Sequence, residues 1–293
     1  MLKAFRLLTI SIVSFPFTLS SAWAHEFETV QFPGAVFTQL TGGPNVEGTS
    51  VGDYTDAAGL THGFKLTIDG KMTSFDPPGS QFTTPNYINL EGVIVGGYLD
   101  AGGVARGFVL KGGKFTTLDF PGAAGTILTG ISALGEISGE SCESILCDTI
   151  THSFVRSVGG VFTSFDPPGA VSSGAATVSI FGEVVGSYTD SAGNTHGYVL
   201  NHGTYTTIDV PGAAFTFAGG GNDQGDVVGT SADANGVTSA FLLCRGTFTT
   251  FEAPGSGTGS GQGSGASGIN VEGTIVGTYV NSANTTFGFI RYR

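Results

Sequence analysis

Tyrosine and aspartate recur in this sequence two residues apart, each time after a short apolar segment. Aromatic rings stack on the apolar faces of sugars, and carboxylates accept hydrogen bonds from sugar hydroxyls. The pattern therefore predicts repeated ligand-binding positions for an extracellular carbohydrate. The predicted set comprises Tyr54, Asp56, Tyr98, Asp100, Tyr188, Asp190, Asp233 and Tyr279.

The same aspartates could instead have a structural role in their turns. Each begins a turn that ends in glycine, as in Asp56-Ala57-Ala58-Gly59, where the carboxylate can bond the backbone of its own turn. Repetition of the position favours this second interpretation, because a turn is needed in every repeat.

A second series of acids precedes the Pro-Gly steps: Asp76, Asp119, Asp166, Asp209 and Glu252. We expect these acids to fix the crossovers by accepting backbone N–H bonds. Symmetry predicts a ring of similar carboxyls, whereas glycoside cleavage needs two carboxyls in unlike environments. The chain also has no Gly-x-Ser-x-Gly nucleophile motif, so no catalytic residue is predicted.

Three anchors recur in order six times, and the glycines of successive Pro-Gly pairs lie 43 to 47 residues apart. The first is a Pro-Gly pair, the second is Val-Gly or a close variant, and the third resembles His-Gly-Phe. Such a period is the sequence signature of a repeat architecture. The Pro-Gly pairs are Pro33-Gly34, Pro78-Gly79, Pro121-Gly122, Pro168-Gly169, Pro211-Gly212 and Pro254-Gly255.

Each repeat predicts four short strands joined by links rich in glycine, asparagine and aspartate. Glycine contributes 49 of 293 residues and charged residues 12%, a composition that disfavours helices. We therefore predict an all-β, six-bladed β-propeller of about 45-residue, four-stranded repeats. A β-solenoid is the alternative.

The two ends of the chain bear on this choice. The segment Phe27 to Val30 matches a fourth strand, and Phe287 to Arg293 matches a third strand. The last repeat therefore lacks one strand, which the N-terminal segment supplies. Pairing the two closes the ring and removes the open sheet edges, an arrangement for which a solenoid has no use.

These repeats resemble the bacterial extracellular repeats called HAF, named for a His-Ala-Phe step. The step is His-Gly-Phe at His62 and His-Gly-Tyr at His196. The resemblance extends over nearly all of the predicted mature chain. It implies propeller-like repeats and an extracellular location, but it carries no assigned activity and no catalytic residues.

The N-terminus predicts an export signal over residues 1–24. Lys3 and Arg6 precede an apolar stretch, and Ala22-Trp23-Ala24 fits a cleavage site. We thus expect a secreted protein, extracellular or periplasmic, with one domain over residues 25–293. No later apolar run is long enough to insert into a membrane. The net charge of −12 argues against nucleic acid as a partner.

Cys142 and Cys147 lie in one loop and are candidates for a disulfide, while Cys244 lies in an apolar strand. A metal site at the cysteine pair and free thiols are the alternatives. No metal site or cofactor is predicted, although Asn222 to Asp226 offers oxygens for calcium without the spacing of an EF-hand loop.

These observations favour a non-enzymatic, monomeric propeller that binds an extracellular glycan or a surface protein. Two alternatives stay open: a structural protein of the matrix or envelope, and a secreted glycoside hydrolase or lyase with a site on one face. Propellers host many functions, so the fold does not decide between them.

Overall fold

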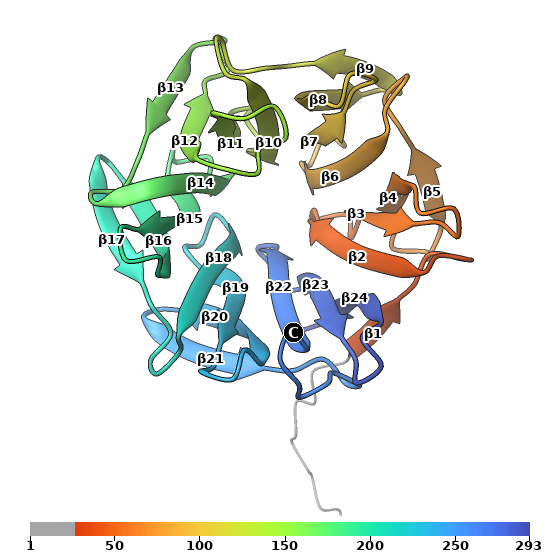
Figure 1. Cartoon of the computed structure of the whole chain (residues 1–293), viewed down its shortest axis with the longest axis vertical. Coiled ribbons are helices and arrows are strands. Elements are labelled where there is room, and N and C mark those ends of the chain that lie inside the picture. Colours follow the sequence, from red (N-terminus) through yellow and green to blue (C-terminus); the bar gives the residue numbers. More distant parts are fainter. Residues whose placement is uncertain (1–26) are drawn as a thin grey trace, which may run out of the picture.

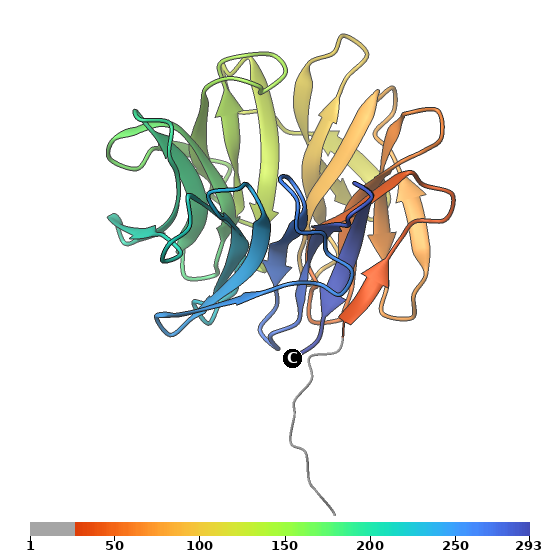
Figure 2. The ribbon, with the colours of Figure 1, turned by 60° about the horizontal axis from the view of Figure 1, so that its bottom comes forward.

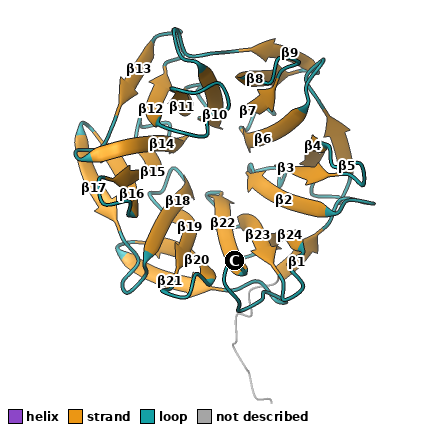
Figure 3. Cartoon of the chain, viewed as in Figure 1, coloured by secondary structure: helices purple, strands orange, loops and turns teal. Residues whose placement is uncertain are grey.

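The computed structural model describes residues 27–293, and the predicted signal segment 1–24 lies outside them. The described part of the chain contains 24 β-strands and no α-helix (Figure 3). It accordingly has no helix able to cross a membrane. The abundance of glycine and β-branched residues accounts for this all-β structure.

The strands form six antiparallel groups of four, here called units 1 to 6. Unit 1 comprises β2 (Phe37–Gly42), β3 (Ser50–Thr55), β4 (Thr61–Leu66) and β5 (Met72–Phe75). Unit 2 comprises β6 (Phe82–Ile88), β7 (Ile94–Leu99), β8 (Ala105–Lys111) and β9 (Lys114–Thr117). Unit 3 comprises β10 (Gly125–Ile131), β11 (Ile137–Cys142), β12 (Thr151–Arg156) and β13 (Phe162–Phe165).

The other three units follow the same order. Unit 4 comprises β14 (Ala170–Val178), β15 (Val184–Asp190), β16 (Thr195–Asn201) and β17 (Thr204–Ile208). Unit 5 comprises β18 (Phe215–Gly221), β19 (Val227–Ala232), β20 (Thr238–Cys244) and β21 (Thr247–Phe251). Unit 6 comprises β22 (Gly263–Ile269), β23 (Ile275–Val280), β24 (Thr286–Arg291) and β1 (Phe27–Val30).

The six units stand around a common centre, with the first strand of each unit innermost (Figure 1). Seen obliquely, they form a short, wide body in which the strands run steeply between the two faces (Figure 2). Strand β1 pairs antiparallel with β24, with Phe27 opposite Arg291 and Val30 opposite Gly288. The two ends of the described chain therefore meet in unit 6, as the segment pattern predicted.

A glycine facing an aromatic ring explains two of the three recurring anchors. In every unit a glycine of the second strand pairs with an aromatic residue of the third, and all six rings are fully buried. The first strand carries a β-bulge at this level, which brings one of its carbonyls against the glycine. The pairs are Gly52–Phe64, Gly96–Phe108, Gly139–Phe154, Gly186–Tyr198, Gly229–Phe241 and Gly277–Phe289.

Asparagines in the turns between first and second strands join neighbouring units. The Asn45 Oδ1 accepts the backbone N–H of Thr49, while its Nδ2 donates to the carbonyl of Asn89 at 3.1 Å. Asn89 repeats this bond to Ser132, and Asn222 repeats it to Asn270. These bonds hold the turns of successive units together at one end of the central channel, so the opposite face carries the Pro-Gly crossovers and the aspartate turns.

Candidate functional site

The predicted ligand-binding aspartates form part of their own turns. The Asp56 Oδ1 accepts the backbone N–H groups of Ala58 at 2.8 Å and Leu60 at 2.9 Å. Asp100, Asp190 and Asp233 make the same two bonds, as does the equivalent Asn281. The backbone N–H of Asn194 is the main cause that lowers the pKa of Asp190 to about 2. One oxygen of each carboxylate is thus committed to the turn.

The second oxygen faces a histidine or an arginine in three units. His62 lies between two carboxylates, with Nδ1 2.7 Å from Asp76 Oδ2 and Nε2 3.6 Å from Asp56 Oδ2. His196 is placed in the same way between Asp209 and Asp190. In unit 2 an arginine replaces the histidine: Arg106 donates to Asp100 at 3.1 Å and to Asp119 at 3.0 Å.

The acids before the Pro-Gly steps therefore differ from expectation. Within residues 27–293, Asp119 alone among these five acids accepts a backbone N–H bond, from Gly107 at 3.1 Å, while Asp76, Asp166 and Asp209 bond histidine rings. The reason is strand pairing, because each acid lies just beyond the outer strand, level with the second residue of the third strand: Phe75 pairs with Gly63, so Asp76 comes next to His62.

The predicted tyrosines do not converge on one site, since each belongs to its own unit. Tyr54 stacks on Phe32 with ring centroids 3.6 Å apart, and its hydroxyl donates to Ser74. The Tyr279 side chain is only 6% exposed, so its ring is not accessible to a ligand. Tyr98 and Tyr188 line two separate clefts on the face of the aspartate turns.

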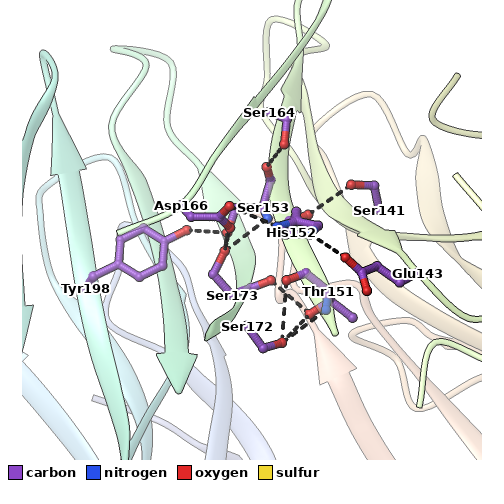
Figure 4. Close-up of polar contacts among 10 residues, drawn as sticks. All are labelled: Ser141, Glu143, Thr151, His152, Ser153, Ser164, Asp166, Ser172, Ser173 and Tyr198. Atoms are coloured by element: carbon purple, nitrogen blue, oxygen red, sulfur yellow. Dashed lines mark hydrogen bonds and ion pairs between the residues drawn. The ribbon is translucent and has the colours of Figure 1, made fainter. Parts of the chain in front are cut away.

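Unit 3 extends its histidine cluster into a larger polar network that reaches unit 4 (Figure 4). The His152 Nδ1 lies 2.9 Å from Asp166 Oδ2, and its Nε2 lies 3.4 Å from Glu143. The Ser173 hydroxyl donates to the other oxygen of Asp166 at 2.6 Å. A serine nucleophile would need its hydroxyl at the imidazole Nε2, which here faces Glu143, so the network is not a catalytic triad.

A cleft of about 440 Å³ opens beside this network and runs between units 3 and 4 to the centre of the ring, where residues of the other four units also line it. Its walls are dominated by hydroxyl groups, with two aromatic rings, Tyr188 and Phe217, and one carboxyl, Glu140. Phe217 is 43% exposed. The hydroxyls belong to Thr41, Thr129, Thr151, Ser172, Ser173, Ser187, Tyr188, Thr189, Thr195, Thr230 and Ser267.

Glu140 and Asp53 occupy the same repeat position, directly after the buried glycine of the second strand, but their surroundings differ. Asp53 is 1% exposed and accepts a bond from Gln39 Nε2 at 2.8 Å. Glu140 faces Ile127 across its strand pair and lies against Gly174 of the next unit, where a side chain would collide with its carboxylate. Burial raises the pKa of both acids to about 7.

The sequence reasoning missed Glu140, Gly174 and the serines beside them. A signal was present in the repeat alignment, because the position of Glu140 holds Gly97, Ser187, Thr230 and Thr278 in other units. A carboxyl at a position that holds glycine, serine or threonine in these units must either bond other groups inside the protein or face a cleft that is open to solvent. The depth of the cleft, however, depends on packing between units.

The raised pKa values of three histidines and two buried acids predict that the protein is less stable in alkaline than in mildly acidic solution. Hydrogen bonds that the protonated rings of His62, His152 and His196 donate to aspartates raise the pKa of these histidines, so their stabilisation is present below pH 6.5 and is lost as the pH rises through the folded pKa. Burial raises the pKa of Asp53 and Glu140, which adds a loss of stability up to about pH 7. Because each of these acids contributes a loss of about 1.4 kcal/mol per pH unit between pH 5 and pH 7, we expect the free energy of unfolding to fall by roughly 3 to 5 kcal/mol from pH 5 to pH 8.

Urea denaturation at a series of pH values measures this slope. Asp53→Asn should flatten it, whereas the matched control Asp233→Asn, in an exposed turn, should leave it unchanged. Equal stability at both ends of the pH range, or a slope that Asp53→Asn leaves intact, would contradict this expectation.

Cys142 and Cys147 form a disulfide in the loop between β11 and β12. The Ile145 carbonyl in this loop accepts the backbone N–H of Ala105 in unit 2 at 2.7 Å. Leu146 lines a smaller, apolar cleft of about 300 Å³ together with Tyr98. Cys244 is a free, partly buried cysteine of β20.

The segment considered for calcium is a turn whose oxygens are already used in part. The Asn222 Oδ1 accepts backbone N–H bonds from Gln224 and Asp226, and Nδ2 contacts the Asp226 carboxylate at 3.2 Å. Within residues 27–293 no group of three or more histidine, cysteine, aspartate or glutamate side chains is arranged to hold a metal ion.

The fold is that of known β-propellers. A fungal lectin of Aleuria aurantia, described as a six-bladed β-propeller that recognises fucose, aligns over 87% of this chain and 93% of its own, at 12% identity and TM-score 0.52. A gluconolactonase of Xanthomonas campestris aligns over 92% and 90%, at 13% identity and TM-score 0.57. A putative TolB of Agrobacterium tumefaciens aligns over 88% and 91%, at 13% identity and TM-score 0.58.

No protein-family model matches the sequence, and no curated protein matches it. The likeness to solved structures therefore shows the fold alone.

Proposed function

We propose that this protein is a secreted, six-bladed β-propeller that binds an extracellular carbohydrate in the cleft between units 3 and 4. The observation that carries the proposal is the lining of that cleft, which combines many hydroxyls with two aromatic rings and one carboxyl. Hydroxyls and the carboxyl can exchange hydrogen bonds with sugar hydroxyls, and the rings offer apolar faces for stacking. The volume lies within the usual range of ligand pockets.

The composition of the cleft supports binding without cleavage. Glycosidases place two carboxyls on opposite sides of the bond that breaks. Glu140 is the one carboxyl among the described residues that line this cleft. The acids of the histidine clusters are engaged with cations and turns, which leaves them poorly suited to act as a second catalytic group.

Closure of the ring by the N-terminal strand, kinship with HAF repeats and export are also part of this proposal. The pairing of β1 with β24 supports a ring of six blades closed by the N-terminal strand. The repeat pattern supports kinship with HAF repeats, and the N-terminal segment supports export. The Cys142–Cys147 disulfide is in keeping with an oxidising compartment.

A glycan-array screen of the purified exported protein, with and without calcium, tests the proposal. We expect saturable binding to one class of carbohydrate. Tyr188→Ala should weaken that binding about tenfold, because it removes a ring from the cleft wall. Tyr54→Ala is the matched control, since Tyr54 holds the same repeat position outside the cleft and should leave the affinity unchanged.

Absence of binding to every glycan in both conditions would contradict the proposal and favour a structural role. Equal losses in the two tyrosine variants would instead point to repeated sites, one in each unit that keeps the tyrosine. Release of shorter sugars from a bound polysaccharide would show that the cleft belongs to an enzyme.

A further inference from the structure

Glu140 is the one ionisable acid in the cleft, and nothing in the cleft balances its charge. No lysine, arginine or histidine is among the described residues that line the cleft, and no side chain donates a hydrogen bond to the Glu140 carboxyl within residues 27–293. A carboxylate removed from water without a partner is costly.

Comparison with unit 1 shows what Glu140 lacks. The acid at the same position there, Asp53, receives hydrogen bonds from Gln39 of its own unit and Thr84 of the next. Around Glu140 the two corresponding residues are Ile127 and Gly174, and neither has a side chain that can donate.

Unit 3 therefore keeps the acid while both of its side-chain donors are replaced. The replacement by Gly174 also makes room, because a Cβ atom there would lie 2.1 Å from the Glu140 Oε1. The result is a carboxyl that lines an open cleft, with its oxygens available to a donor on a ligand.

A ligand ammonium group meets this need better than a ligand hydroxyl. Both groups can donate a hydrogen bond to the carboxylate, but only the ammonium also carries the opposite charge, which adds a Coulombic attraction and balances the charge of Glu140. A bound ammonium would also favour the ionised carboxyl, whose pKa burial otherwise raises to about 7. The net charge of −12 attracts cationic ligands to the protein as a whole.

We infer that the carbohydrate bound in this cleft carries a free amino group that pairs with Glu140, as in an oligosaccharide of glucosamine. This inference rests on the proposed function, and it adds the class of sugar. The amine pairs with the carboxylate, while the remaining sugar hydroxyls contact the half-buried Ser172 and Thr151 at the cleft wall.

Isothermal titration calorimetry with three matched tetrasaccharides tests the inference. The probes are the β-1,4-linked tetramers of glucosamine, N-acetylglucosamine and glucose, which differ only at the second carbon of each ring. We expect the glucosamine tetramer to bind at least about tenfold more tightly than the other two, the ratio that one charge-assisted hydrogen bond provides. Glu140→Gln should reduce that preference to about twofold or less.

Glu272→Gln is the control variant, because it changes the net charge equally at an exposed position outside the cleft. A preference for the amine that survives Glu140→Gln would mean attraction to the acidic surface as a whole, and it would overturn the inference. Equal binding of all three sugars in the wild type would also overturn it while leaving the proposed function intact. Failure of every sugar on a broad array would overturn both.

Discussion

Replacing Gly277 with alanine is expected to lower the free energy of unfolding by about 3 kcal/mol. The added Cβ would lie 2.1 Å from the carbonyl oxygen of Gly265 and 2.7 Å from the ring of Phe289. Phe289 is 1% exposed, so its ring has no space into which it can turn. The carbonyl belongs to the neighbouring strand next to its bulge and cannot move without breaking the ladder.

Urea denaturation measures this effect, and Gly97→Ala is the matched control. Gly97 lies in the equivalent second strand of unit 2, but the atoms nearest to its added Cβ are 3.5 Å away, which is ordinary contact. The control should stay within about 0.5 kcal/mol of the wild type. A Gly277→Ala protein as stable as the Gly97→Ala control would contradict the role of the glycine–aromatic pairs as the reason for the repeated anchors.

Removal of residues 27–31 from a protein of residues 25–293 is expected to lower the melting temperature by about 10 °C or more and to promote aggregation. The deletion takes away β1, exposes the edge of β24 and uncovers the cluster in which Val30 packs with Leu40 and Phe64. It also removes the contact between Thr29 and the Tyr279 hydroxyl.

A synthetic peptide of residues 25–33, added to the truncated protein, should restore much of the lost stability by pairing with β24. A peptide of the same composition in scrambled order is the control and should have no effect. A truncated protein as stable as the intact one would show that the pairing of the two ends contributes nothing to the fold.

Much of the fold could be predicted from the sequence because it follows from periodicity. The recurring Val-Gly and His-Gly-Phe steps are the two halves of one buried contact, so they had to recur in every unit. The N-terminal segment matches a fourth strand and the C-terminal segment matches a third strand. This match likewise predicted the strand order of unit 6. The asparagine bonds between units could not be predicted, because they depend on how closely neighbouring turns approach.

The site was less predictable, for a physical reason. Repetition revealed Tyr54 and Asp56 and their equivalents, and these residues stabilise turns and ion pairs within their units. A binding cleft in a repeat protein arises where the repeats differ, and such a difference has no periodicity. Glu140 beside Gly174 is a departure of this kind, and its meaning depends on the donors that surround Asp53 and are missing here.

The stoichiometry of carbohydrate binding tests the central claim most directly. Calorimetric titration of the exported protein with the best ligand from the array gives the number of sites per chain. A single site between units 3 and 4 predicts one equivalent per chain, with binding lost when Gly174→Val fills the space beside Glu140. Several equivalents per chain, or full binding by the Gly174→Val protein, would contradict the account and return the binding sites to the repeated turns.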